Sequence, residues 1–91
     1  MKKKMVIQLT PPADIPPVLL EEVILGMVDI LVGDGSEKYY GDWVEREDIV
    51  DLSAALRHTF QGNDEIDIDS GYPHSFHAAT RMMLIAMRSV K

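Results

Sequence analysis

The fold is decided by residues 16–32, PPVLLEEVILGMVDILV, which predict a nearly apolar helix. The two prolines suit its first turn, where a missing N–H group costs no hydrogen bond. Gly33 is typical of the left-handed residue that follows a last helical turn. The polar positions form one narrow stripe: Glu22, Gly26 and Asp29. Because the apolar arc is much wider than ~100°, one neighbouring face cannot cover it. We therefore expect this helix to be the central element of the core or one half of an interface.

Two further helices are predicted after it. Asp42 and Glu45 have the spacing of a capping box and favour a helix over about 45–61. Its apolar positions fall on one side, helped by Ala55, and we expect this side to face the core: Ile49, Leu52, Leu56 and Phe60. Asp51 belongs to the opposite side, which we expect to face water. Helical spacing of apolar residues over 74–90 predicts the last helix.

Two short strands complete the predicted fold. Residues 4–9 and 64–69 both alternate between apolar and polar side chains, as half-buried strands do. Lysines near the first strand and acids on the second favour their pairing. The sequence thus predicts a single small α+β domain over 1–91, in the order β-α-α-β-α, with two paired strands and three helices. Residues 1–4 are expected to form a flexible basic N-terminus.

Length and composition exclude several classes of protein. Ninety-one residues provide one domain. The chain has no cysteine, which excludes disulfides, thiolate metal sites and cysteine nucleophiles and suits a reducing cytoplasm. The apolar run after Lys4 is too short for a signal peptide. Residues 16–32 carry three acids and are shorter than a membrane span of about 20 apolar residues. We expect a cytoplasmic protein that does not enter a membrane.

Charge is concentrated in the middle of the chain. The whole sequence has a formal charge of −6. Residues 34–69 contain eleven acids against three bases, a net charge of −8, whereas the flanks contain four acids against six bases. Such a surface repels a phosphate backbone, so the charge disfavours direct binding of nucleic acid. The last helix carries basic residues of its own, Arg81 and Arg88, and a nucleic-acid surface there is a third possibility, against which the overall charge counts.

A protein partner is the leading functional hypothesis. Three large aromatic residues lie beside the acidic residues in a glycine-rich connector at 34–41, where we expect a brief extended piece, and in the residues just after it. Aromatic anchors with a polar rim are typical of protein interfaces. The predicted partner-binding residues are Tyr39, Tyr40, Trp43, Glu45, Glu47, Asp48 and Asp51. We expect a non-enzymatic regulator or inhibitor without a cofactor, with a nucleic-acid mimic of the phage or plasmid kind as a special case.

Self-association is also expected. The first and last predicted helices carry more apolar surface than one chain of this length can cover. A second copy would cover it in a symmetric homodimer.

The alternative hypothesis is a metal-dependent or acid/base enzyme. Asp67 and Asp69 on the predicted second strand precede His74 and His77, which share one face of a helix. Carboxylate and imidazole groups together suit a divalent metal ion. The spacing matches neither a calcium loop nor a zinc-protease helix. Ser70 near these histidines lacks the sequence of a nucleophile elbow, so the pattern does not favour a catalytic triad.

Overall fold

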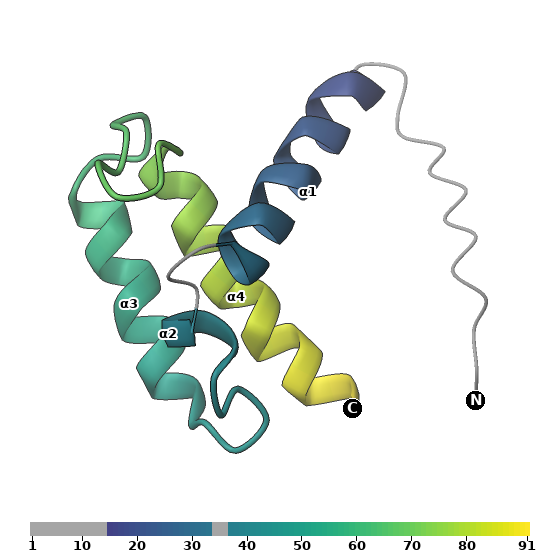
Figure 1. Cartoon of the computed structure of the whole chain (residues 1–91), viewed down its shortest axis with the longest axis vertical. Coiled ribbons are helices and arrows are strands. Elements are labelled where there is room, and N and C mark those ends of the chain that lie inside the picture. Colours follow the sequence, from purple (N-terminus) through teal and green to yellow (C-terminus); the bar gives the residue numbers. More distant parts are fainter. Residues whose placement is uncertain (1–14, 34–36) are drawn as a thin grey trace.

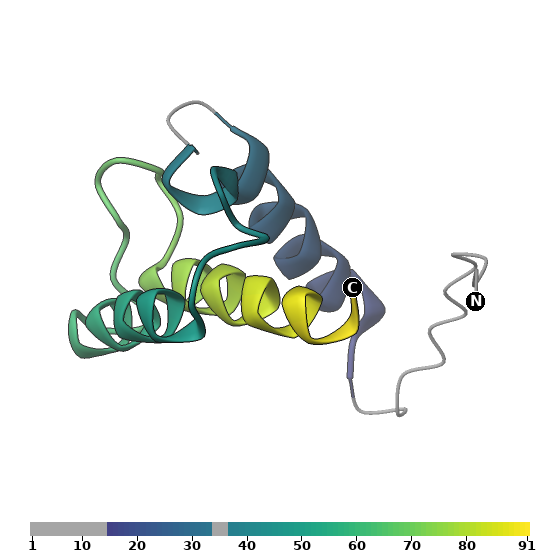
Figure 2. The ribbon, with the colours of Figure 1, turned by 90° about the horizontal axis from the view of Figure 1, so that it is seen from below.

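The protein is described by a computed structural model, which covers residues 15–33 and 37–91. Helix α1 comprises Pro17–Val32, α2 Glu37–Tyr40, α3 Asp48–Phe60 and α4 His74–Val90. Helix α4 lies between α1 and α3 and packs against both (Figure 1). Viewed from below, α3 and α4 run side by side while α1 lies on the other side of α4 (Figure 2).

The predicted α+β class is wrong, because the described residues form a small helical domain without a sheet. The expected strand at 64–69 is a loop whose sole β-type pairing is an isolated antiparallel bridge between Ile66 and Pro73. The backbone N–H groups of Asp69 and Ser70 donate to Oδ1 of Asp67 at 2.9 and 3.2 Å. This Asx turn bends the chain out of the extended conformation. The other expected strand, at 4–9, lies outside the described residues.

The first and last helices match the prediction within one residue, since 16–32 and 74–90 were expected. Gly33 differs from the expectation of a left-handed residue: its φ of −78° and ψ of −175° are extended. Its N–H group still makes the last i→i−4 hydrogen bond, to the carbonyl of Asp29 at 2.7 Å, and α1 ends there because ψ leaves the helical region.

The segment between α1 and α3 departs further from the predicted secondary structure than the two long helices do. Tyr39 and Tyr40 form the end of the helical turn α2 and not the extended piece that was expected. Helix α3 begins at Asp48, three residues later than predicted, because residues 41–45 form turns and Asp42 has a φ of 48°. The predicted capping box therefore does not cap α3.

Helix α3 also faces the other way. Its expected core residues lie exposed to solvent: Ile49, Leu52, Leu56 and Phe60. The buried positions are Asp51, Ala54 and Ala55, which face α4. The two alanines allow a close approach of the helices, and Asp51 is paired with arginines of α4. Of the side that the apolar pattern predicted to be buried, Ala55 is buried, whereas the four larger residues are not.

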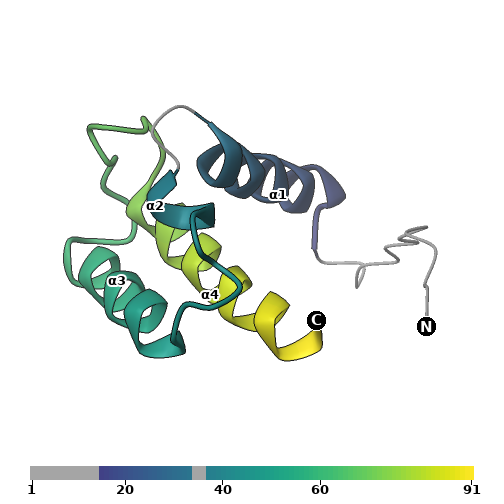
Figure 3. The same cartoon turned by 60° about the horizontal axis from the view of Figure 1, so that its bottom comes forward.

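The apolar core lies where α1, α2 and α4 meet. It consists of Ile30, Tyr39 and Leu84, surrounded by partly buried Leu31, Trp43, Tyr72 and Phe76. The short α2 lies over α4, between α1 and α3 (Figure 3), and its Tyr39 packs with Ile30 of α1 and Leu84 of α4. Over residues 15–33 and 37–91, no helix has both the length and the hydropathy that crossing a membrane requires.

Candidate functional site

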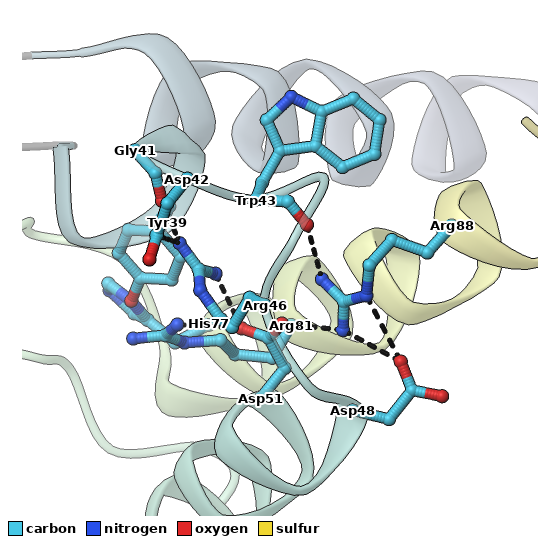
Figure 4. Close-up of polar contacts among 10 residues, drawn as sticks. All are labelled: Tyr39, Gly41, Asp42, Trp43, Arg46, Asp48, Asp51, His77, Arg81 and Arg88. Carbon is cyan, nitrogen blue, oxygen red and sulfur yellow. Dashed lines mark hydrogen bonds and ion pairs between the residues drawn. The ribbon is translucent and has the colours of Figure 1, made fainter.

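An aspartate and three arginines occupy the junction of α3 and α4. Asp51 has no exposed surface. Its Oδ1 accepts hydrogen bonds from Nη1 of Arg46 at 2.9 Å and Nη1 of Arg81 at 2.7 Å. Oδ2 forms an ion pair with Nη2 of Arg88 at 2.8 Å that lacks good hydrogen-bond alignment. Figure 4 shows the guanidinium groups converging on this carboxylate from the loop before α3 and from α4. We call Asp51, Arg46, Arg81 and Arg88 the arginine cluster.

The arginine cluster keeps Asp51 ionised. Burial alone would raise the pKa of the Asp51 carboxyl, but hydrogen bonds from the arginines outweigh burial, and the pKa is lowered. Exposed acids balance the remaining charge, since Asp42 pairs with Arg46 at 3.2 Å and Asp48 with Arg88 at 3.0 Å. Three acids of the acidic stretch at 34–69 are therefore paired with arginines within the molecule: Asp42, Asp48 and Asp51.

A hydrogen-bonded chain links α2 to the loop before α4. The Tyr39 hydroxyl contacts Nδ1 of His77, and Nε2 of His77 lies 2.6 Å from Oγ of Ser70. Arg81 lies over the Tyr39 ring, with its guanidinium carbon 4.3 Å from the ring centroid. Burial raises the pKa of the Tyr39 hydroxyl, although Arg81 partly opposes the shift, so the phenol stays protonated at neutral pH.

Two further histidines lie beside this chain. His58 near the end of α3 and His74 at the start of α4 face each other with 2.8 Å between their Nδ1 atoms. The His58 ring also stacks on His77 at 4.7 Å between centroids. Oδ2 of Asp67 lies 3.7 Å from Nδ1 of His74. We call His58, Asp67 and His74 the histidine cluster.

Electrostatics favour neutral imidazole in this cluster. Burial, followed by the neighbouring His77 and His74, lowers the pKa of His58 to about 4. The pKa of the Asp67 carboxyl is also lowered: burial would raise it, but hydrogen bonds from the backbone of Asp69 and Ser70 prevail. At neutral pH the cluster therefore presents an uncharged His58 ring and an ionised carboxylate.

The structure separates the predicted partner-binding residues. Tyr39 and Asp51 are buried, at 2% and 0% exposure, and Trp43 packs against the core. Asp48 is exposed but paired with Arg88. The residues that remain open to contact are Tyr40, Glu45 and Glu47. The aromatic trio thus does not form one surface patch.

The predicted metal ligands are partly brought together. Asp67 and His74 belong to the histidine cluster. His77 instead contacts Ser70 and Tyr39, and Asp69 contributes its backbone N–H group to the Asx turn. Sequence reasoning missed His58. One signal could have indicated it: if the helices predicted at 45–61 and 74–90 pack antiparallel, the end of the former, with His58, lies beside the start of the latter, with His74.

A broad apolar surface lies on α1. Only Gly26 and Ile30 of this helix are buried. Its exposed apolar residues cover several turns: Val18, Leu19, Val23, Ile24, Leu25, Val28 and Val32. We call these seven residues the α1 face; Val18, Leu25 and Val32 are its most exposed members, at 71%, 60% and 65%. A smaller exposed stripe runs along α3.

No protein-family model, curated protein or solved structure matches the chain.

Proposed function

We propose that the chain is a cytoplasmic, non-enzymatic interaction module that acts as a homodimer. The α1 face carries this proposal. Seven exposed apolar residues on one helix of a small domain favour an interaction site, because water-exposed apolar area costs free energy that association recovers. Exposed Glu21, Glu22 and Asp29 lie on the same helix beside these residues, so a partner would meet an apolar surface with acidic neighbours.

A second copy of the chain is the occupant that fits best. In a two-fold dimer each α1 face meets its own equivalent, so apolar residues such as Leu25, Val28 and Val32 would pack against their own kind. The α3 stripe has fewer residues: Ile49, Leu52, Leu56 and Phe60. We therefore place the dimer contact on α1.

Sedimentation velocity or light scattering at micromolar protein tests this proposal. We expect a dimer for the wild type and a monomer for Leu25→Glu, with an unchanged helical circular dichroism spectrum. Leu56→Glu is the matched control, since Leu56 is exposed to a similar degree, 48%, but lies on α3. A wild type that stays monomeric at high micromolar concentration would contradict the proposal. Dissociation by Leu56→Glu alone would move the contact to α3.

We further propose that the dimer binds a protein partner through the loop before α3. The proposed partner surface is supported by Tyr40, Glu45 and Glu47, which lie exposed at the end of α2 and in the segment that leads to α3. Charge reversal of Glu45 and Glu47 leaves the arginine cluster intact, unlike changes at Asp51. We expect such a variant to lose a partner that the wild type captures from its source cell, with binding that weakens as salt rises. Equal capture by both proteins would exclude this loop. The nucleic-acid mimic loses support, since Asp42, Asp48 and Asp51 are paired with arginines.

Acid/base catalysis is the second candidate function. The chain Ser70–His77–Tyr39 favours it, because it has the order of a nucleophile, a base and a group that orients the base. If Nδ1 of His77 donates to the Tyr39 oxygen, Nε2 carries no proton and can accept the Ser70 proton across the 2.6 Å contact. The Tyr72 N–H group also donates to Oγ of Ser70 at 3.1 Å, which fixes the hydroxyl in a turn.

Labelling with a fluorophosphonate probe tests this second candidate. We expect covalent modification at Ser70 that is lost in Ser70→Ala and in His77→Gln. Ser75 provides the control, since Ser75→Ala should leave the labelling unchanged. No labelling of the wild type would leave the Ser70 contact with a structural role in the turn.

A further inference from the structure

Three side chains with metal-binding atoms converge where α3 ends, the loop at 61–73 turns and α4 begins. His58, Asp67 and His74 each offer one ligand atom, and these three atoms all lie within 4.8 Å of one another. The Nδ1 atoms of His58 and His74 are 2.8 Å apart, and Oδ2 of Asp67 lies 3.7 Å from Nδ1 of His74. The three ligands come from separate parts of the chain, so the fold alone brings them together.

The spacing is close to that of a four-coordinate metal site. Zinc lies about 2.0–2.1 Å from imidazole nitrogen and carboxylate oxygen, which puts two tetrahedral ligands about 3.3 Å apart. The His58–His74 pair must therefore open by about 0.5 Å, and the Asp67–His74 pair must close by about 0.4 Å. The third pair, His58 and Asp67, lies within 4.8 Å and therefore must close by at most about 1.5 Å.

The lone pairs also point to a cation. When both rings are neutral, two Nδ1 atoms at 2.8 Å need one proton between them, so one ring donates and the other accepts. A metal ion in place of that proton gives both nitrogens a positive partner. His58 and His74 can then both bind as neutral imidazole, which is the form that metals require.

The carboxylate is already oriented for this role. Oδ1 of Asp67 accepts the N–H groups of Asp69 and Ser70, while Oδ2 faces His74. Hydrogen bonds that fix a ligating carboxylate strengthen metal binding, because less freedom is lost when the ion binds. Asp69 thus supports the site through its backbone, and its own carboxylate is not a ligand.

We propose that His58, Asp67 and His74 form a three-ligand site for a divalent first-row transition metal ion of the Zn²⁺ type. Two imidazoles and one carboxylate suit such ions, whereas Mg²⁺ and Ca²⁺ prefer sites made of oxygen. Three protein ligands leave a fourth position for water or for a group of a bound molecule. A bound ion would fasten the loop at 61–73 to both helices. The site shares no residue with the α1 face, so it stands apart from the proposed dimer.

Isothermal titration of ZnCl₂ into the untagged, chelator-treated full chain tests the site. We expect saturable binding of one ion per chain and a rise in the melting temperature. His58→Gln and His74→Gln should abolish the binding. Asp67→Asn should weaken it at least about tenfold, since the amide oxygen still accepts the turn hydrogen bonds but carries no charge. MgCl₂ and CaCl₂ should give no saturable heat.

Asp69→Asn is the matched control, because it removes an exposed carboxylate two residues from Asp67 and should bind Zn²⁺ like the wild type. Absence of binding by the wild type at high micromolar concentration would overturn the proposal. Undiminished binding by Asp67→Asn and both histidine variants would also overturn it, since the ion would then lie elsewhere. If a histidine variant fails to fold, the comparison of Asp67→Asn with Asp69→Asn decides.

Discussion

Asp51 of α3 and Arg81 of α4 form a buried ion pair, with 2.7 Å between Oδ1 and Nη1 across thirty residues of sequence. Arg46 and Arg88 bind the same carboxylate. The side chains of the three arginines are each 10% exposed or less. In a chain whose buried apolar core is small, this cluster fixes how α3 sits on α4.

Loss of the central carboxylate should therefore be costly. Asp51→Ala leaves three nearly buried guanidinium groups without their shared partner, so we expect the free energy of unfolding to fall by about 3–5 kcal/mol. Urea denaturation followed by circular dichroism measures the change. The control is Asp48→Ala, which removes a largely exposed partner of Arg88 and should cost about 1 kcal/mol or less. Equal losses in the two variants would contradict the role assigned to Asp51.

Gly26 should not tolerate a methyl group. A Cβ atom there would lie 2.5 Å from Cε2 of Phe76, so the ring on α4 must move. Alanine favours a helix by about 1 kcal/mol over glycine, but overpacking costs about 1–3 kcal/mol. We expect Gly26→Ala to be destabilising in urea denaturation. In a Phe76→Ala background the same change should be much less destabilising, because the contact with Phe76 is gone and only the closer-than-usual 3.2 Å contact with Cε1 of Tyr72 remains. A stabilising effect in the wild type would argue against this close approach of α1 and α4.

Phe60 should contribute little to stability despite its size. It is 84% exposed, so we expect Phe60→Ser to change the free energy of unfolding by about 0.5 kcal/mol or less. A core phenylalanine would cost about 3–5 kcal/mol on truncation. Leu84→Ala is the contrast, since Leu84 is 1% exposed and its truncation should cost about 2–5 kcal/mol. A large loss from Phe60→Ser would restore the orientation of α3 that the sequence pattern predicts.

Acid should destabilise the metal-free protein through His58. Its pKa is about 4 in the folded chain against 6.5 in the unfolded chain, so the unfolded state binds the proton more tightly. The stabilising contribution of the neutral ring is complete above pH 6.5 and is lost as the pH falls from 6.5 to 4. Partial exposure of the ring reduces the size of the effect through solvent screening.

Unfolding in urea with EDTA at several pH values measures this dependence. We expect His58→Gln to have a shallower loss of stability between pH 6.5 and 4 than the wild type. Parallel curves for the two proteins would show that His58 does not carry the effect.

The two longest elements of the fold could be predicted from the sequence. Pro17–Val32 and His74–Val90 form helices because their apolar spacing and the prolines at their starts favour the same conformation. The excess apolar surface of the first helix was also visible, because so few polar residues interrupt it. These features are local, and a local pattern is enough to define them.

The orientation of α3 and the composition of both clusters were decided by tertiary structure. The apolar stripe from Ile49 to Phe60 predicted the buried face of α3. Instead, Asp51 forms ion pairs with Arg81 and Arg88 of α4, thirty or more residues away, and the face that carries Asp51 is buried. The alternation at 64–69 predicted a strand, but a strand needs a neighbouring strand to accept its backbone hydrogen bonds. Here the backbone N–H groups of Asp69 and Ser70 donate to the Asp67 side chain instead.

His58 illustrates the same limit at the candidate metal site. Its sequence neighbours carry no ligand pattern, since the other two ligands follow nine and sixteen residues later at irregular spacing. Only the packing of α3 against α4 brings its Nδ1 atom to that of His74. Helix formation depends on neighbours in the chain, whereas a polar cluster depends on which faces meet, and the sequence by itself determined only the former.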